Sequence, residues 1–215
     1  MIVTRSITHP VAVEEIIEAR EAGTLESVLP SGANVKASLG DDEITFDVAR
    51  DSKRTFLVMH DAMPEPHCMN DEWTNKGGWP ASEMRRHVLE VFEQFPVEFK
   101  ELAVPIKIKQ TCRGEVVESE DTAFLLSASQ VFGYDWLKER DCGDEQLDIF
   151  ADPRNRVKFR RGASSASWWW LRSANYSSGF DSVSSDGSSA YNGAGAYAEG
   201  GVAVGFCIES RDLEI

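Results

Sequence analysis

The stretch of sequence that decides the fold reads WWWLRSANYSSGFDSVSSDGSSAYNGAGAYAEGGVAVGFCI, over residues 168–208. It begins and ends with apolar runs, at residues 168–171 and 202–208. Short apolar runs bounded by turn residues are typical of buried strands. Between them, residues 174–198 contain only Ser, Ala, Gly, Tyr, Asn, Asp, Phe and Val. We therefore expect two core strands that hold a loop-rich surface between them.

Residues 174–198, which we call the tract, have two interpretations. Runs rich in Gly and Ser are usually flexible linkers. Two features oppose that interpretation: Phe180 and Val183 suit buried strand positions, and Asp186-Gly187 is a hairpin-turn dipeptide. Because a linker needs neither feature, we interpret the tract as an ordered surface.

The composition of the tract resembles that of an antibody paratope. Tyr offers a large, stiff, amphipathic contact at low entropic cost, while Ser, Gly and Asn supply adaptable hydrogen bonds. The tract therefore predicts a ligand-binding face, with Tyr176, Tyr191 and Tyr197 as its anchors.

Outward from the tract, the chain predicts a mixed α+β fold. Helical spacing and capping signals, including a capping box at Ser127–Gln130, predict helices over residues 11–22, 79–95, 97–102 and 128–133. Apolar runs and alternation predict strands over residues 35–39, 43–48, 55–60, 104–112 and 122–126. We divide the chain into an N-terminal helical extension, residues 1–30, and one domain, residues 31–215, with its ligand-binding region at about 164–208. The first helix docks either on this domain or on another subunit.

Charge narrows the choice of partners. The formal net charge of −14 repels phosphate backbones and anionic lipid, so we expect neither nucleic acid nor a membrane surface as a partner. We expect the basic run to pair with acidic surface elsewhere; its members are Arg154, Arg156, Lys158, Arg160 and Arg161. The N-terminal residues lack the pattern of a signal peptide, and no apolar stretch approaches the length of a membrane span. We expect a protein that is cytoplasmic as made.

Cysteine and histidine spacing predicts no metal site. The cysteines lie far apart without a CxxC pair, at Cys68, Cys112, Cys142 and Cys207, so we expect free thiols. The histidines repeat no metal-ligand spacing and stand at His9, His60, His67 and His87. We therefore expect no metal and no required cofactor.

Four side chains before the tract have expected structural roles. The three tryptophans 168–170 cannot all face one way on a strand, so at least one packs inward and another is free to floor the binding face. Arg172 follows this apolar run and would be costly to bury alone, so we expect it to pair with a carboxylate.

Five motifs, spread from about residue 40 to residue 209, resemble a bacterial and phage domain family of unknown function. They are Asn75–Trp79 with Glu83–Arg85, Phe124–Ser127 with Val131–Gly133, Trp169–Ser173, Ser185–Gly187 and Gly201–Ile208. Several members of that family resemble the variable proteins of diversity-generating retroelements, which display mutated residues on a C-type-lectin fold. The resemblance implies a C-type-lectin-like scaffold, related to the formylglycine-generating enzyme fold.

The same resemblance implies a receptor- or adhesin-like variable protein rather than an enzyme. Its ligand would be a protein or a glycan, and its context a homo-oligomer or a phage or surface assembly. Virion assembly and partner-mediated export are two routes from the cytoplasm to such a surface.

One property of the tract fits retroelement mutagenesis independently of the motifs. That mutagenesis replaces adenines, usually in Asn-type codons ending in a pyrimidine, which cannot yield Lys, Glu, Gln, Met or Trp. The tract lacks all five. The predicted ligand-binding positions are Asn175, Tyr176, Ser177, Ser178, Asp181, Ser182, Ser188, Ser189, Tyr191, Asn192, Gly193, Gly195 and Tyr197. The predicted scaffold positions are Trp169, Trp170, Arg172, Phe180, Asp186, Gly187 and Phe206.

Two alternative functions stay open at this point. In the first, the tract is invariant and the protein is a structural or interaction module of a phage or surface assembly. In the second, the protein is an oxidase of the formylglycine-generating type, whose chemistry uses closely placed cysteines. Cys207 stands alone in an apolar run, where an inert thiol is expected, so we predict no catalysis.

Overall fold

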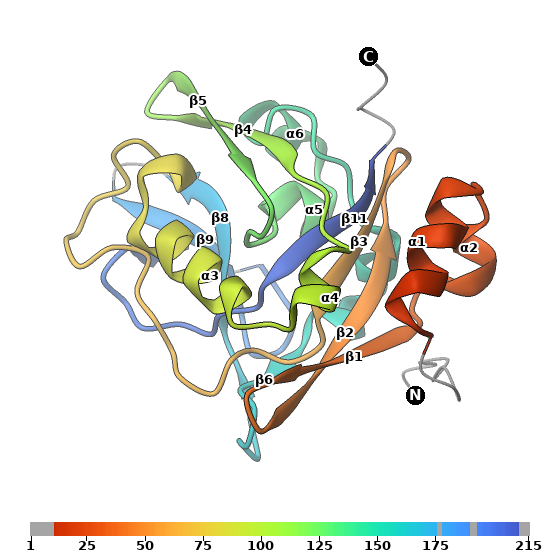
Figure 1. The fold of residues 1–215 in the computed structure, drawn as a ribbon. Coiled ribbons are helices and arrows are strands. Elements are labelled where there is room, and N and C mark those ends of the chain that lie inside the picture. Colours follow the sequence, from red (N-terminus) through yellow and green to blue (C-terminus); the bar gives the residue numbers. More distant parts are fainter. Residues whose placement is uncertain (1–10, 176–177, 190–192, 211–215) are drawn as a thin grey trace.

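The computed structural model describes residues 11–175, 178–189 and 193–210, and it has a mixed α+β architecture (Figure 1). The α-helices are α1 (Val13–Glu21), α2 (Leu25–Val28), α3 (Glu83–Glu93), α4 (Val97–Lys100), α5 (Ala128–Phe132) and α6 (Asp135–Arg140). The 3-10 helices are η1 (Trp79–Ala81), η2 (Asp148–Ala151) and η3 (Pro153–Arg156). The strands are β1 (Asn34–Leu39), β2 (Asp42–Arg50), β3 (Arg54–Met59), β4 (Ile106–Cys112), β5 (Glu115–Asp121), β6 (Lys158–Phe159), β7 (Ala166–Ser167), β8 (Trp169–Asn175), β9 (Gly179–Val183), β10 (Ala194–Gly195) and β11 (Gly205–Ser210).

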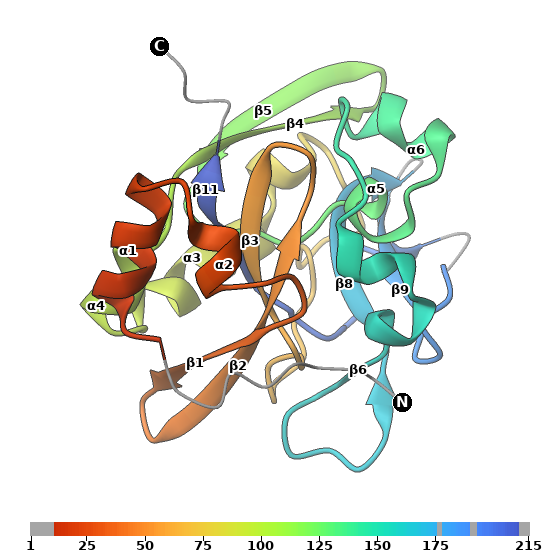
Figure 2. The ribbon, with the colours of Figure 1, turned by 90° about the vertical axis from the view of Figure 1, so that its right-hand side faces the viewer.

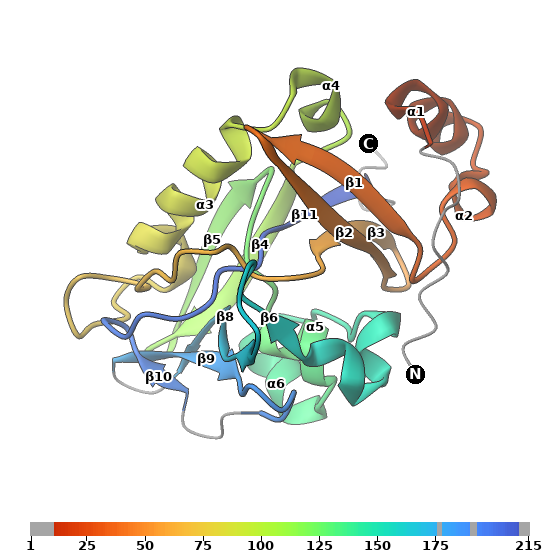
Figure 3. The same cartoon turned by 90° about the horizontal axis from the view of Figure 1, so that it is seen from below.

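Two antiparallel sheets organise the molecule. The larger sheet has the strand order β1-β2-β3-β11, so the last strand of the chain pairs with β3. The smaller sheet has the order β10-β9-β8 and carries the tract. Figure 3 shows it on the opposite side of the molecule from β1 and β2. The remaining strands form two hairpins, β4-β5 and β6-β7.

The larger sheet buries one face beneath the helices. Ile44, Phe46 and Val48 alternate along β2 and are all buried, as the period of two predicted. Phe46 meets Phe206 of β11 at a ring-centroid distance of 5.6 Å, and α3 closes this cluster through Phe92, 5.1 Å from Phe206. These contacts place the core between α3 and the sheet.

The N-terminal helices dock on this domain. Ile16 of α1 and Leu25 of α2 are buried in the same core as the sheet residues. Arg20 donates from Nη1 to the carbonyls of Leu102 and Ile208, at 3.3 and 3.2 Å. Figure 2 shows both helices against one side of the larger sheet. Of the two docking modes that the sequence left open, the structure shows the first.

Two expected elements differ from those observed. The strand expected over residues 122–126 is wrong: Phe124 makes one bridge to Gly205, and the neighbouring strand is β5, which ends at Asp121. β5 escaped prediction because its glutamates are exposed and its pairing with β4 depends on a two-residue turn, in which Arg113 and Gly114 both have positive φ.

The helix expected over residues 79–95 starts later than its apolar stripe suggested. Residues 79–81 form η1, and α3 begins only at Glu83. Ser82 caps α3 by accepting a hydrogen bond at Oγ from the Arg85 amide, at 3.1 Å. The capping box at Ser127–Gln130 is confirmed, and Gly133 ends α5 in a left-handed conformation.

In the basic run of residues 154–161, the predicted pairing with acidic groups is confirmed at Arg154 and Arg161, whereas Arg156 donates to the Phe150 carbonyl and Lys158 is buried. Arg154 pairs with Asp152 and Arg161 with Asp42, as expected of a surface run. Lys158, only 1% exposed, instead donates to the carbonyl of His60 at 2.9 Å and lies 5.2 Å from the centre of the Trp169 ring. Burial lowers the pKa of Lys158. Lys158 is therefore a core residue and not part of a basic surface.

Candidate ligand-binding surface

The strand β8 anchors the tract because every one of its residues is buried. Trp169 and Trp170 are fully buried, and their indole nitrogens donate to the carbonyls of Arg156 and His67, each at 2.9 Å. A buried tryptophan needs such an acceptor to avoid an unpaired N–H group. Trp168 is half-buried and meets Trp170 edge-on at 4.9 Å. The expectation that at least one tryptophan packs inward is confirmed, because two do.

Arg172 is the charged centre of this strand. Its side chain is buried and pairs with Asp144, which confirms the carboxylate partner expected from the sequence. Nη1 also donates to the Leu125 carbonyl at 2.9 Å and to Gln130 Oε1 at 2.7 Å. A buried guanidinium is tolerated when its charge and its N–H groups have such partners. Arg172 thereby ties β8 to the segments before and within α5.

The α5 segment also accepts and donates hydrogen bonds that connect it to β8. The amide of Ala128 donates to Ser173 Oγ at 2.8 Å. Gln130 Oε1 accepts the Ser127 amide at 2.9 Å and also the Arg172 guanidinium. The side chain of the capping box is therefore shared between the helix end and β8. Two motifs that lie about forty residues apart in sequence meet here in one hydrogen-bonded cluster.

Asn75 links the end of β8 to the start of β9. Its Nδ2 donates to the carbonyl of Asn175, the last residue of β8, and at 2.9 Å to that of Gly179, the first residue of β9. Its Oδ1 accepts from Arg113 Nε at 3.0 Å. One buried amide thus holds the end of β8 and the start of β9 together. Sequence reasoning quoted Asn75 as a motif residue but assigned it no role.

A buried carboxylate fixes the segment that carries Asn75. Asp121 accepts the indole N–H of Trp79 at 2.9 Å and Nε of Arg85 at 2.7 Å, and its side chain is fully buried. Gly78, between Asn75 and Trp79, has φ +61°, and a Cβ there would overlap the Gln110 amide. The two glycines of the motif therefore belong to a close approach that only glycine permits.

The predicted ligand-binding positions divide into four groups. Ser188 and Tyr197 are exposed, and the half-buried positions are Ser178, Ser189, Gly193 and Gly195. Tyr176, Ser177, Tyr191 and Asn192 lie outside the described residues. The remaining three, Asn175, Asp181 and Ser182, are buried.

The expectation of exposure is therefore wrong for Asn175, Asp181 and Ser182. Asn175 ends β8, and its carbonyl accepts from Asn75. Asp181 pairs with Arg140 of α6, and burial raises its pKa to about 6 against the lowering effect of that arginine. Ser182 is 3% exposed on β9. Asp181 thus faces α6, while Ser182, the next residue of the strand, points to the opposite face of β9 and is buried there.

An aromatic pair stands on the exposed part of the tract. Tyr197 is 56% exposed and Trp73 is 67% exposed, and their rings meet edge-on at 5.7 Å. Gly195 lies beneath both: a Cβ there would be 3.0 Å from Tyr197 Cε1 and 3.4 Å from Trp73 Nε1. Sequence analysis missed Trp73 because it lies in an irregular segment without periodicity. The one available signal was a tryptophan among polar residues.

Comparison with known proteins gives a family but no characterised relative. Residues 53–210 match the domain of unknown function DUF6273. The chain belongs to this family. No curated protein and no solved structure matches it. The DUF6273 region begins at β3 and ends at β11, so it includes the whole of the smaller sheet.

Most of the predicted scaffold positions are buried within the DUF6273 domain. Phe180 and Phe206 are fully buried. Asp186 is exposed, and its Oδ1 accepts the Ser188 amide at 3.0 Å, which closes the turn. Gly187 has φ +82°, and a Cβ there would lie 2.7 Å from the Pro153 carbonyl. The predicted turn at Asp186-Gly187 is confirmed.

The DUF6273 domain contains all four cysteines of the chain and three of its histidines. All four cysteines are free, and burial raises the pKa of Cys207 to about 12. Among the described residues, no three His, Cys, Asp or Glu side chains group as a metal site would require. Nor does that part of the chain contain a helix able to cross a membrane.

Proposed function

We propose that this chain is a ligand-binding variable protein of a diversity-generating retroelement, with a C-type-lectin-like scaffold. The observation that carries the proposal is the division of the tract. Its composition is restricted to eight residue types. The residues that support it are buried and hydrogen-bonded, and we call them the frame: Asn75, Asp121, Arg172 and the buried residues of β8 and β9. Ser188 and Tyr197, by contrast, are exposed. A surface that changes its side chains without unfolding needs this arrangement.

The ligand in this proposal is a protein or a glycan. Tyr197 and Trp73 offer two exposed aromatic rings, the side-chain type that contributes most to binding hot spots. Ser178, Ser188 and Ser189 add exposed or half-buried hydroxyl groups elsewhere on the tract, and such groups adapt to either kind of ligand. The protein is made in the cytoplasm and reaches its surface by virion assembly or partner-mediated export.

The decisive experiment compares closely related copies of the gene and the neighbouring DNA. We expect amino-acid differences to concentrate at the exposed tract positions, and to spare Asn75, Arg172 and Asp121. We also expect a near-copy of the segment coding for residues 168–208 beside a reverse transcriptase gene, with Asn codons at the variable positions. Differences scattered evenly along the chain, without such a repeat, would leave an invariant interaction module instead.

A further inference from the structure

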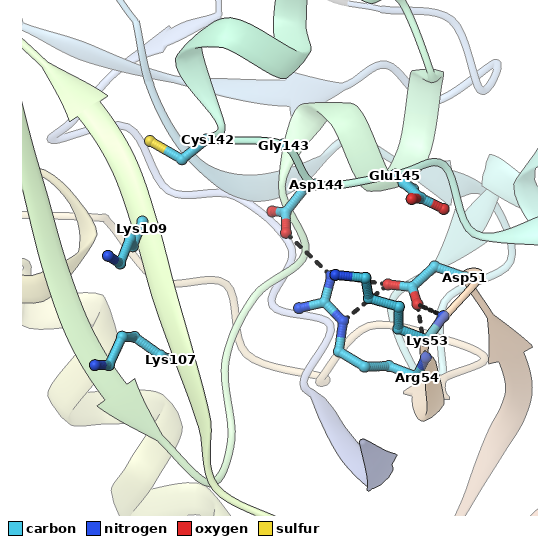
Figure 4. Close-up of a pocket in the computed structure, with 9 residues that line it drawn as sticks. All are labelled: Asp51, Lys53, Arg54, Lys107, Lys109, Cys142, Gly143, Asp144 and Glu145. Atoms are coloured by element: carbon cyan, nitrogen blue, oxygen red, sulfur yellow. Dashed lines mark hydrogen bonds and ion pairs between the residues drawn. The ribbon is translucent and has the colours of Figure 1, made fainter. Parts of the chain in front are cut away.

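A second polar site lies away from the tract, in a cavity of about 180 Å³ between the start of β3, the outer face of β4 and the turn at residues 142–145 (Figure 4). Its cationic lining consists of Lys53, Arg54, Lys107 and Lys109. Its acidic lining consists of Asp51, Asp144 and Glu145. In a chain with fourteen more acidic than basic residues, a cavity with a basic excess is unexpected.

The acidic side chains of the cavity already have hydrogen-bond donors. Asp51 accepts the amides of Lys53 and Arg54, at 2.8 and 2.7 Å, and also Nε of Arg54 at 2.9 Å. Asp144 pairs with the buried Arg172. Glu145 accepts the Ser52 hydroxyl at 2.9 Å. Each carboxylate is therefore turned toward a donor of the protein, which reduces its repulsion of an incoming anion.

Arg54, Lys107 and Lys109 can still donate hydrogen bonds to a bound anion. Arg54 uses Nε and Nη2 toward Asp51 and Asp144, and within the described ranges its Nη1 makes no hydrogen bond to another residue. Burial opposes the charge of Arg54, but Asp51 and Asp144 outweigh it and raise its pKa, so the group stays cationic. Lys109 forms an exposed pair with Glu118 at 3.3 Å, a contact weak enough to exchange. Lys107 has no ion pair with any residue that the structure describes.

We infer that this cavity binds a small oxyanion of the phosphate class, held by the Arg54 guanidinium and by the ammonium groups of Lys107 and Lys109. Lysine acts as a flexible point charge and arginine supplies a directed N–H group, the combination that recognises phosphate oxygens. The volume accepts a phosphate group with a small organic substituent. Inorganic phosphate and a phosphate monoester are the two sources of this chemistry.

The site is connected to the frame of the tract by a chain of charges. Arg54 Nη2 lies 3.5 Å from Asp144 Oδ1, and the other oxygen of Asp144 contacts Arg172 on β8. An anion beside Arg54 thus acts one carboxylate away from the strand that leads into the tract. Because an anion that binds only the folded protein stabilises it by mass action, its binding raises the melting temperature.

The test measures melting temperature in phosphate, in glycerol 3-phosphate and in sodium chloride of equal ionic strength. We expect either phosphate compound to raise Tm by roughly 2–4 °C over chloride when its concentration is well above its Kd. A larger rise with glycerol 3-phosphate than with phosphate would identify a monoester as the ligand. The double variant Lys107→Ala, Lys109→Ala should lose the rise. The matched control, Lys36→Ala, removes an exposed lysine of β1 and should keep it.

A second measurement tests the location of binding even if the double variant folds poorly. Cys142 is exposed, and Figure 4 shows its thiol on the side of Lys109. Bound phosphate should slow alkylation of Cys142 by iodoacetamide several-fold and leave the half-buried Cys68 unchanged. An equal Tm rise in the double variant, or unchanged Cys142 alkylation in the wild type, would overturn the inference. Neither readout uses the tract ligand, so this inference stands or fails independently of the proposed function.

Discussion

The strand β8 and the exposed part of the tract are neighbours in the sequence but differ in burial and in hydrogen bonding. Along β8, Trp170 and Arg172 are buried, and each has named hydrogen-bond partners. Within the tract, Tyr197 stands in solvent beside Trp73. The first region tolerates few substitutions because each leaves a buried group unpaired. The second tolerates many, so the two together separate stability from recognition.

The largest effect should come from breaking the frame at its charged centre. Arg172→Met removes the buried arginine partner of Asp144 and leaves that carboxylate with only the longer contact to Arg54, at 3.5 Å. We expect the free energy of unfolding to fall by about 3–5 kcal/mol, measured by urea denaturation. Arg154→Met is the control, because Arg154 is largely exposed in its pair with Asp152, and its stability should equal that of the wild type. Equal losses in both variants would remove the distinction between frame and surface.

Asp181 offers a pH test of the same frame. Burial raises its pKa in the folded protein to about 6, above the ordinary value of 3.8. Between these two values the folded protein binds more protons than the unfolded chain, so the contribution of Asp181 to stability is complete below pH 3.8 and is lost as pH rises through 6. Relative to Asp181→Asn, the wild type should gain up to about 3 kcal/mol between pH 7 and pH 4. Parallel pH profiles of the two proteins would show that Asp181 has an ordinary pKa.

Asn75 is the next position to test, because it donates hydrogen bonds to both the end of β8 and the start of β9. Asn75→Ala leaves the carbonyls of Asn175 and Gly179 without this donor. We expect a loss of about 1–3 kcal/mol in the free energy of unfolding. Hydrogen exchange should rise at the ends of β8 and β9 more than in β3, which lies in the other sheet. Uniform exchange throughout the molecule would contradict a local role for Asn75.

Much of this frame could be predicted from sequence where a side chain has only one tolerable environment. Arg172 after an apolar run required a carboxylate, and the Ser127–Gln130 spacing required a capped helix; both were found. Burial within the tract could not be predicted, since Ser182 and Ser188 are the same residue in similar surroundings. Their difference is one of tertiary position: Ser182 lies within β9, which is paired on both sides by β8 and β10, whereas Ser188 lies in the turn after β9. Lys158 shows the same limit, because its carbonyl partner belongs to His60.

That matched pair of serines gives the finest test of the comparison. Ser188→Tyr places a large side chain on an exposed turn, and we expect the free energy of unfolding to change by less than about 0.5 kcal/mol. Ser182→Tyr forces the same side chain into a site that is 3% exposed on β9, and overpacking should cost about 1–3 kcal/mol or more. Urea denaturation of the two variants measures the difference. If both variants were as stable as the wild type, Ser182 would belong with the exposed positions after all, and β9 would be part of the variable surface rather than its support.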